Sequence, residues 1–345
     1  MIRFESDYTE GAHEQILEAM LRTNMEQTPG YGVDLHCENA REMIRKQCDA
    51  PNADVHFLVG GTQANMTVIA SILRAHQGAV CATSGHINVH ETGAVEATGH
   101  KVLTIPSDDG KITAAQVEEL CEEHYLDDSV EHTVQPGVVY ISNPTENGTL
   151  YSKKELEELS VVCKKYHMPL FLDGARLGYG IMAEGNDLTL ADIAKMCDVF
   201  YIGGTKVGAL FGEAVVITND ALKKDFRYFI KQKGGMLAKG RLLGIQFEEL
   251  FRDGLYFKIA KHADELAMEI KKAFEEKEIP FAYESVTNQQ FPILTKEQAD
   301  KLSEKYSFTR NENMLKKGPA MVRFCTSWAT KKEDVAALVQ DILML

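Results

Sequence analysis

The sequence has no excess of positive charge and no long apolar run. Its 345 residues carry 37 Lys and Arg against 51 Asp and Glu, for a formal net charge of −14. Because nucleic-acid phosphates are bound by basic side chains in excess, this balance argues against a nucleic-acid partner. No apolar stretch is long enough to span a bilayer, and the first residues lack the pattern of a signal peptide. We therefore expect a cytoplasmic protein without a membrane partner.

Paired cysteine and metal-binding motifs are absent as well. The seven cysteines are scattered and form no CxxC pair. An odd, dispersed set in a chain of this size is typical of reduced thiols in the core of a cytosolic protein. The eleven histidines show no HExxH or other metal-ligand spacing, so we expect no metal site.

Short apolar runs alternate with helical patterns through the middle of the chain. Such strands, linked by helices such as those expected at residues 62–74 and 153–166, indicate an α/β fold with a mainly parallel sheet covered on both faces. A length of 345 residues also exceeds one compact core, and we place the large domain at residues 40–240. The expected strands are residues 55–59, 79–82, 102–105, 138–142, 170–172, 199–202 and 214–217.

The pattern changes after about residue 240. A long helical stretch at residues 242–275 leads into short apolar runs, a helix at 296–305 and a closing helix from residue 331. This order predicts a smaller α+β C-terminal domain over residues 241–345. We expect the N-terminal segment, residues 1–39, to pack against one of the domains or a partner subunit.

A glycine turn follows the first expected strand. Gly60 and Gly61 allow the backbone to approach a ligand closely, and Thr62 adds a hydroxyl donor where a helix begins. The turn is a candidate phosphate cradle, although the same pattern often serves only tight packing. It matches neither GxGxxG nor the P-loop, which argues against nicotinamide and nucleotide cofactors.

Asp173 and Arg176 follow a second apolar strand. Ligands of open α/β sheets bind at the carboxyl ends of the strands. A carboxylate at this place can hold the protonated ring nitrogen of a ligand, and the Arg176 fork can bind a carboxylate or a phosphate. Taken alone, Asp173 is better explained as the cap of the next helix.

Lys206 follows a third apolar strand, after two glycines and a threonine. Burial at such a place lowers the pKa of the amine and makes it nucleophilic toward an aldehyde, whereas the alternative is a lysine that extends from the sheet edge to water. His86 comes shortly after another strand and is placed to stack on a flat ring, although a lone histidine is more often structural. A phosphate anchor, an anion for a ring nitrogen and a reactive amine together predict a pyridoxal 5′-phosphate site.

These motifs resemble those of the L-threonine aldolases, within the aromatic amino acid β-eliminating lyase/threonine aldolase family of fold-type I pyridoxal-phosphate enzymes. The resemblance runs nearly end to end, and its most specific part is Asp-Gly-Ala-Arg at 173–176 followed by Lys206. The matching stretches are residues 6–7, 30–34, 61–65, 86–91, 93, 147–148, 173–176, 206 and 321–323.

The resemblance implies the roles of the cofactor-binding residues. Lys206 would form the Schiff base with the cofactor, and Asp173 would pair with its ring nitrogen. Gly61 and Thr62 would hold the phosphate, and His86 would stack on the ring.

The resemblance also implies how the substrate and a second subunit enter the site. Ser6, Arg176 and Arg323 would bind the α-carboxylate of a small amino-acid substrate, which orients the bond to be broken. The family's sites lie between the subunits of a homodimer or homotetramer, so Tyr31 is expected to come from a partner subunit.

Two positions depart from the family pattern. Glu146 stands where family members have a histidine thought to help remove the β-hydroxyl proton. Leu237 stands where they have an arginine that helps bind the phosphate, and Lys239 is the nearest replacement. These departures leave the cofactor expectation intact and weaken the assignment of the substrate.

The expected reaction is retro-aldol cleavage of threonine or allo-threonine to glycine and an aldehyde, with Glu146, His86 or a water as the base. The nearest alternative is a β-eliminating lyase of the same cofactor class that acts on another amino acid, and a transaminase fits the resemblance less well. A non-catalytic binding protein on this scaffold and a nucleotide-binding α/β protein are the alternatives from other classes.

Overall fold

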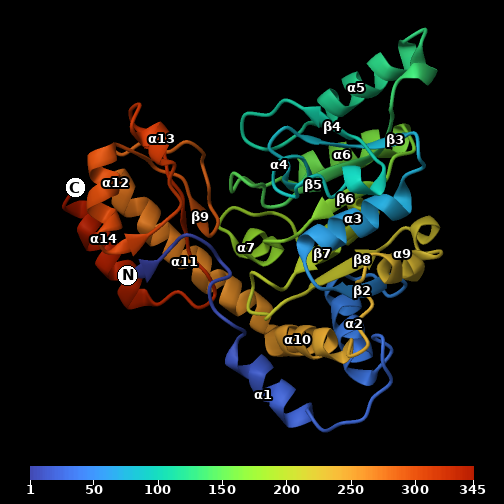
Figure 1. The fold of residues 1–345 in the computed structure, drawn as a ribbon, viewed down its shortest axis with the longest axis horizontal. Helices are drawn as coiled ribbons and strands as arrows, with labels where there is room; N and C mark the ends of the chain where they lie inside the picture. The colour runs from blue at the N-terminus through green and yellow to red at the C-terminus, as the bar shows by residue number, and fades with distance from the viewer.

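The computed structural model describes all 345 residues, which form two lobes connected by one long helix (Figure 1). The larger lobe is built on a seven-stranded sheet with the strand order β2-β8-β7-β6-β5-β3-β4. Strand β8 is antiparallel to both of its neighbours, β2 and β7, and all other pairs are parallel. The predicted mainly parallel sheet is therefore confirmed. All seven expected strands are present, as β2 (Asp54–Leu58), β3 (Gln77–Ala82), β4 (Val102–Ile105), β5 (Gln135–Ser142), β6 (Leu170–Asp173), β7 (Val199–Gly203) and β8 (Glu213–Ile217).

Successive residues of each strand enter two different cores, one on each face of the sheet. In β6, Leu170 and Leu172 pack into the first core, whereas Phe171 packs into the second. This alternation follows from the pleat of the strand, and both faces are apolar because helices cover both. The first face is covered by α5 (Ala114–Leu126), α6 (Lys153–Lys165) and α8 (Leu190–Met196), and the second by α3 (Gly61–Ile72) and α9 (Phe226–Gln232).

The smaller lobe has a core of its own. Helix α11 (Leu255–Glu276) runs diagonally between the lobes in Figure 1, with Ala263 in the sheet core and Leu266 in the second lobe's core. The rest of this lobe is formed by β9 (Gln289–Gln290), β10 (Ile293–Leu294), α12 (Lys296–Ser303), β11 (Tyr306–Ser307), α13 (Glu312–Leu315), β12 (Ala320–Met321), β13 (Phe324–Cys325) and α14 (Lys332–Leu343).

The long helical stretch expected at residues 242–275 is present, but it is divided into two helices. Helix α10 (Arg241–Phe251) ends before α11 begins, because Asp253 and Gly254 have φ values of 51° and 69°. Left-handed backbone of this kind cannot continue a right-handed helix. Helix α10 packs against α2 (Leu35–Gln47) at the base of the large lobe.

The N-terminal segment contacts both lobes. Strand β1 (Ile2–Arg3) pairs with β11 of the small lobe, and α1 (Glu14–Thr23) packs on α10 below the large lobe (Figure 1). The chain between them crosses from one lobe to the other. Domain limits at residues 39 and 240 stay a prediction.

All seven cysteines are buried and none forms a disulfide. None of the helices combines the length and the apolar character that crossing a membrane requires. No three His, Cys, Asp or Glu side chains are grouped so that they could hold a metal ion.

Candidate active site

A cavity of about 250 Å³ lies at the carboxyl ends of β5, β6 and β7. Eight of the residues singled out in the sequence line it, although they come from segments far apart in the chain. They are Gly60, Gly61, Thr62, His86, Glu146, Asp173, Arg176 and Lys206. The structure therefore brings the expected phosphate turn, anion and amine into one cavity.

The glycine turn leaves the beginning of α3 open toward this cavity. Gly60 caps the helix without a side-chain hydrogen bond, so the first N–H groups of α3 have no side-chain partner there. A Cβ atom at Gly61 would come within 3.0 Å of the Tyr201 hydroxyl, whereas one at Gly60 would meet nothing within 4 Å. Free N–H groups and the helix dipole together favour an anion such as a phosphate.

Asp173 ends β6 and is held by donors on both carboxylate oxygens. Oδ2 accepts hydrogen bonds from Tyr140 Oη at 2.5 Å and Asn65 Nδ2 at 3.0 Å, and Oδ1 accepts one from the Ala175 N–H at 3.0 Å. Burial favours a higher pKa for Asp173, but the hydrogen bonds from Tyr140, Tyr201 and the Ala175 backbone outweigh it and hold the pKa below its usual value. Asp173 is therefore a buried, charged carboxylate.

Lys206 lies on the turn between β7 and β8. Burial lowers the pKa of its amine, and the nearby Arg176 guanidinium lowers it further. The amine has no hydrogen-bond partner, whereas the Lys206 carbonyl accepts a hydrogen bond from Tyr179 Oη at 2.5 Å. A fixed backbone with an unpaired amine of lowered pKa is what a nucleophilic lysine requires.

Arg176 is already paired with an acidic residue. Its Nε donates to Asp7 Oδ2 at 2.7 Å and its Nη2 to Asp7 Oδ1 at 3.0 Å, and Asn288 Nδ2 also donates to Asp7 Oδ2 at 3.0 Å. Only Nη1 of Arg176 remains without a partner. The sequence places Asp7 in a matching stretch but indicates no role for it, because nothing local predicts a pairing across 169 positions.

Three predicted substrate-binding residues do not line the cavity in this chain. Ser6 lies outside it, whereas Tyr8 lines it. Arg323 donates from Nη1 to Gln289 Oε1 at 3.1 Å and from Nη2 to the Glu5 carbonyl at 3.0 Å. In the structure Arg323 therefore ties the N-terminal segment to the small lobe.

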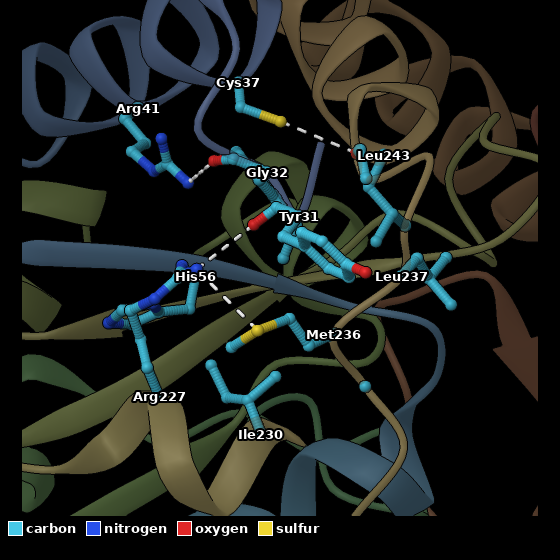
Figure 2. Close-up of a pocket in the computed structure, with 13 residues that line it drawn as sticks. Tyr31, Gly32, Cys37, Arg41, His56, Arg227, Ile230, Met236, Leu237 and Leu243 are labelled. Carbon is cyan, nitrogen blue, oxygen red and sulfur yellow. Dashed lines mark hydrogen bonds between the residues drawn. The ribbon is translucent and has the colours of Figure 1, made fainter. Parts of the chain in front are cut away.

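Tyr31 is the third of them and lies at a separate, smaller cavity of about 30 Å³ (Figure 2). Its side chain is on the surface, and its carbonyl accepts a hydrogen bond from Arg227 Nη2 at 3.2 Å. Met236 and Leu237 line the same cavity, so Leu237 also lies away from Lys206 within one chain. Lys239 is exposed and lines neither cavity.

Glu146 has one fixed carboxylate oxygen. Its Oε1 accepts hydrogen bonds from Ser142 Oγ at 2.7 Å and from the His86 backbone N–H at 3.1 Å. Burial is the main reason that the pKa of Glu146 is raised. The carboxyl group thus lines the cavity with a tendency to keep its proton.

Glu213 is a cavity residue that sequence reasoning missed. It begins β8, is 3% exposed, and accepts a hydrogen bond from the Gly204 N–H at Oε2, at 3.1 Å. Burial raises the pKa of Glu213 to about 8. A signal was present, because Glu213 shares a strand face with Val215 and Ile217, where an acidic residue is unusual.

The chain is similar to known proteins over most of its length. The family described as beta-eliminating lyase matches residues 3–297. A low specificity L-threonine aldolase from a Pseudomonas species is 30% identical, with 99% of this chain and 96% of the relative covered. The solved structure of a threonine aldolase from Leishmania major is 46% identical, with a TM-score of 0.96 and coverage of 99% and 98%.

A more distant structure bears on the fold alone. An aspartate aminotransferase from Thermus thermophilus superimposes with a TM-score of 0.72 at 14% identity, and the match covers 100% of this chain and 91% of the other. The expected α/β fold of fold type I is thereby confirmed.

Proposed function

Because the chain belongs to the beta-eliminating lyase family, we propose that it is a pyridoxal-phosphate-dependent carbon–carbon lyase that cleaves threonine or allo-threonine to glycine and an aldehyde. The observation that carries this proposal is one cavity lined by the Lys206 amine, the Asp173 carboxylate and the open N-terminus of α3. Threonine aldolases that match nearly the full chain support the choice of substrate class.

The residues of the cavity fit the cofactor. Gly61 and Thr62, at the beginning of α3, would hold its phosphate, and Asp173 would keep its ring nitrogen protonated. Lys206 supplies the amine that joins the aldehyde, and His86 offers a flat ring for stacking. When bound, the pyridoxal ring accepts the electron pair released by bond cleavage.

The side chains around Lys206 supply what the reaction needs beyond the cofactor. Arg176 has one free nitrogen, Nη1, with which to bind the substrate's α-carboxylate, and its orientation is fixed by Asp7. We keep Ser6 and Arg323 as proposed partners for the same carboxylate. Fixing the carboxylate orients the Cα–Cβ bond relative to the ring.

A base must take the proton of the β-hydroxyl group, and two cavity residues are candidates. His86 carries an imidazole whose Nε2 has no hydrogen-bond partner. Glu146 carries a carboxyl group whose pKa is raised by burial, which makes its carboxylate a stronger base.

We further propose that the protein is a homodimer or homotetramer whose sites lie near a subunit interface. Large apolar side chains are exposed on and near α1, among them Leu21 at 79% and Met25 at 87%. Tyr31, a few residues further along the chain, is exposed as well. Apolar surface of this kind on a protein indicates a contact with another chain. A partner subunit would bring its own Tyr31 toward this cavity.

The location we propose is the cytoplasm. Seven buried thiols without a disulfide support it, because disulfides persist mainly in oxidising compartments.

The aldolase proposal is tested by product analysis. Purified protein with bound pyridoxal phosphate is incubated with L-threonine and with L-allo-threonine, and glycine and acetaldehyde are measured. We expect both products in equal amounts, and none from Lys206→Ala. Cofactor-loaded protein that forms neither product from either substrate would contradict the proposal.

β-Elimination from serine or cysteine derivatives is the second candidate. The glutamate at position 146, where family members have a histidine, favours it, because its carboxyl group lines the cavity and can exchange a proton with a leaving group. Its products are ammonia and pyruvate. If these are released from serine or cysteine derivatives faster than glycine is released from threonine, β-elimination is the main activity.

A further inference from the structure

His86 is held by a fully buried carboxylate next to the cavity. His86 Nδ1 lies 2.8 Å from Glu91 Oε1, and because a carboxylate only accepts, the nitrogen must carry the proton that it donates. The Glu91 side chain is 0% exposed, whereas that of His86 is 34% exposed and lines the cavity. Glu91 therefore does not line the cavity itself but directly contacts a residue that does.

Asn65 connects this pair to Asp173. The Asn65 Nδ2 group donates to Glu91 Oε1 at 2.7 Å and to Asp173 Oδ2 at 3.0 Å. Both of its hydrogens are thus used, and one amide group fixes the two carboxylates relative to each other. Helix α3 supplies Asn65, so the element that begins with the phosphate turn also sets the place of the His86 ring.

Glu91 Oε2 has no hydrogen-bond partner, although it is buried. All the donors to this carboxylate, His86 and Asn65, are therefore on its other oxygen. His86 is also the only residue in an ion pair with Glu91. A buried carboxylate is costly unless a cation offsets it, so Glu91 favours a proton on the imidazole.

We propose that Glu91 is a positioning residue for the cleavage reaction: it fixes the His86 ring with Nδ1 bound and Nε2 free, so that Nε2 takes the proton of the substrate's β-hydroxyl group. The inference rests on the proposed function and names the base within it. In this step the O–H bond breaks and an N–H bond forms on Nε2. The resulting imidazolium is stabilised by the Glu91 carboxylate.

The arrangement of Glu146 agrees with this assignment. Its Oε1 is occupied by Ser142 and by the backbone N–H of His86, and its pKa is raised by burial. This oxygen is therefore already bound to two donors within the protein, whereas Nε2 of His86 has no partner. Its contact with the His86 backbone instead helps to hold the beginning of α4 (His86–Val89) in place.

Several charged groups act on the His86 ring. Burial alone would lower its pKa, but the Glu91 hydrogen bond and the charges of Asp173 and Glu91 raise it, and the net shift is upward. The titratable groups facing the ring are Glu91, His90, Glu146, Asp173 and Lys206. Removing the charge of Glu91 alone should therefore lower the pKa of His86.

The direct test is nitrogen-15 NMR of the histidine rings in the full-chain protein with its cofactor bound. The His86 signals are identified by their loss in His86→Asn. Above the pKa of His86, we expect a protonated Nδ1 and an unprotonated Nε2. In Glu91→Gln the pKa should fall, while Glu96→Gln, an exposed carboxylate with no hydrogen bond to His86, should leave it unchanged.

Kinetics provide the second readout. Glu91→Gln should lower kcat/KM on the order of tenfold to a hundredfold and move the acidic limb of its pH profile to lower pH. In a protein that already carries His86→Asn, the Glu91→Gln change should lower kcat/KM little further. Either substitution alone disrupts the same hydrogen-bonded pair, so the two effects are not additive. A loss of rate with an unmoved limb would mean that Glu91 serves the structure only, and would overturn the inference.

The wild-type spectrum keeps the inference testable even if Glu91→Gln does not fold. A neutral His86 with its proton on Nε2 would overturn the proposal without any variant. The spectrum is independent of activity, so failure of the inference and failure of the aldolase proposal are distinguishable. The aldolase proposal fails on absent products, whereas the positioning role fails on the wrong tautomer.

Discussion

Asp7 and Arg176 form a buried, two-point ion pair that joins the N-terminal segment to the end of β6. The Asp7 side chain is 0% exposed, and Asn288 of the small lobe donates to the same carboxylate. Parts of the chain that belong to both lobes thus meet at the one arginine that borders the cavity next to Lys206. The contact fixes which edge of the guanidinium group faces the cavity.

Asp7→Asn should destabilise the protein strongly. Removing one partner of a buried ion pair leaves the other charge uncompensated, which costs roughly 3–5 kcal/mol. The free energy of unfolding measured in urea should fall by that amount. Asp108→Asn removes an exposed carboxylate without a hydrogen bond and should change it by less than about 0.5 kcal/mol. Equal effects of the two changes would contradict a structural role for the pair.

The glycine turn can be tested by placing one methyl group in it and one elsewhere. Gly61→Ala brings Cβ to 3.0 Å from the Tyr201 hydroxyl and should displace the N-terminus of α3 by a few tenths of an ångström. Gly11→Ala, whose Cβ would lie 3.8 Å from Leu210 and which does not line the cavity, is the matched control. Titration of the cofactor-free protein with pyridoxal phosphate should show binding weakened about tenfold for Gly61→Ala, equivalent to about 1.4 kcal/mol. Unchanged binding by Gly61→Ala would argue against this turn as the phosphate site.

Glu213 predicts a pH dependence of stability. Its pKa is raised from 4.5 to about 8, so between these values the folded protein retains a proton that the unfolded chain has lost. Stability should therefore fall as pH rises through this window, by at most about 1.4 kcal/mol per pH unit. Glu213→Gln keeps the shape and cannot ionise. The stability of the wild type relative to this variant should decline between pH 5 and 8 in cofactor-free protein, and a constant difference would refute the prediction.

The surface near α1 can be tested by charge. Leu21→Glu together with Met25→Glu places two carboxylates on the exposed apolar surface that we propose to be an interface. Sedimentation should then show smaller particles than the wild type at equal concentration. Glu14→Lys is a control on the same helix, and an unchanged size of the double variant would place the interface elsewhere.

Much of the fold could be predicted from the sequence, because it depends on local patterns. Runs such as residues 170–172 and 199–202 read as buried strands, and each became one. The direction of β8 could not be predicted, since a short apolar run has the same pattern in either orientation. The helix break at Asp253 depends on left-handed backbone that the apolar periodicity across it conceals.

The site was predictable where a reactive side chain comes at or just after the end of a predicted strand, as at Asp173 and Lys206. It was not predictable where a contact depends on distant segments, as between Asp7 and Arg176 or between Glu91 and His86. Those contacts exist only after the sheet has assembled. Tyr31 lies outside the cavity of its own chain, and its proposed role depends on a second subunit.

The Lys206 amine is the centre of the proposed site, and mass spectrometry tests its role most directly. Cofactor-loaded protein is reduced with borohydride, digested, and searched for the peptide that carries the pyridoxyl group. We expect the added mass on Lys206 alone, with loss of the yellow colour, and neither in Lys206→Ala. Two results would contradict this role of Lys206. One is the added mass on another lysine, and the other is a yellow protein that, after reduction, has no pyridoxyl group on Lys206.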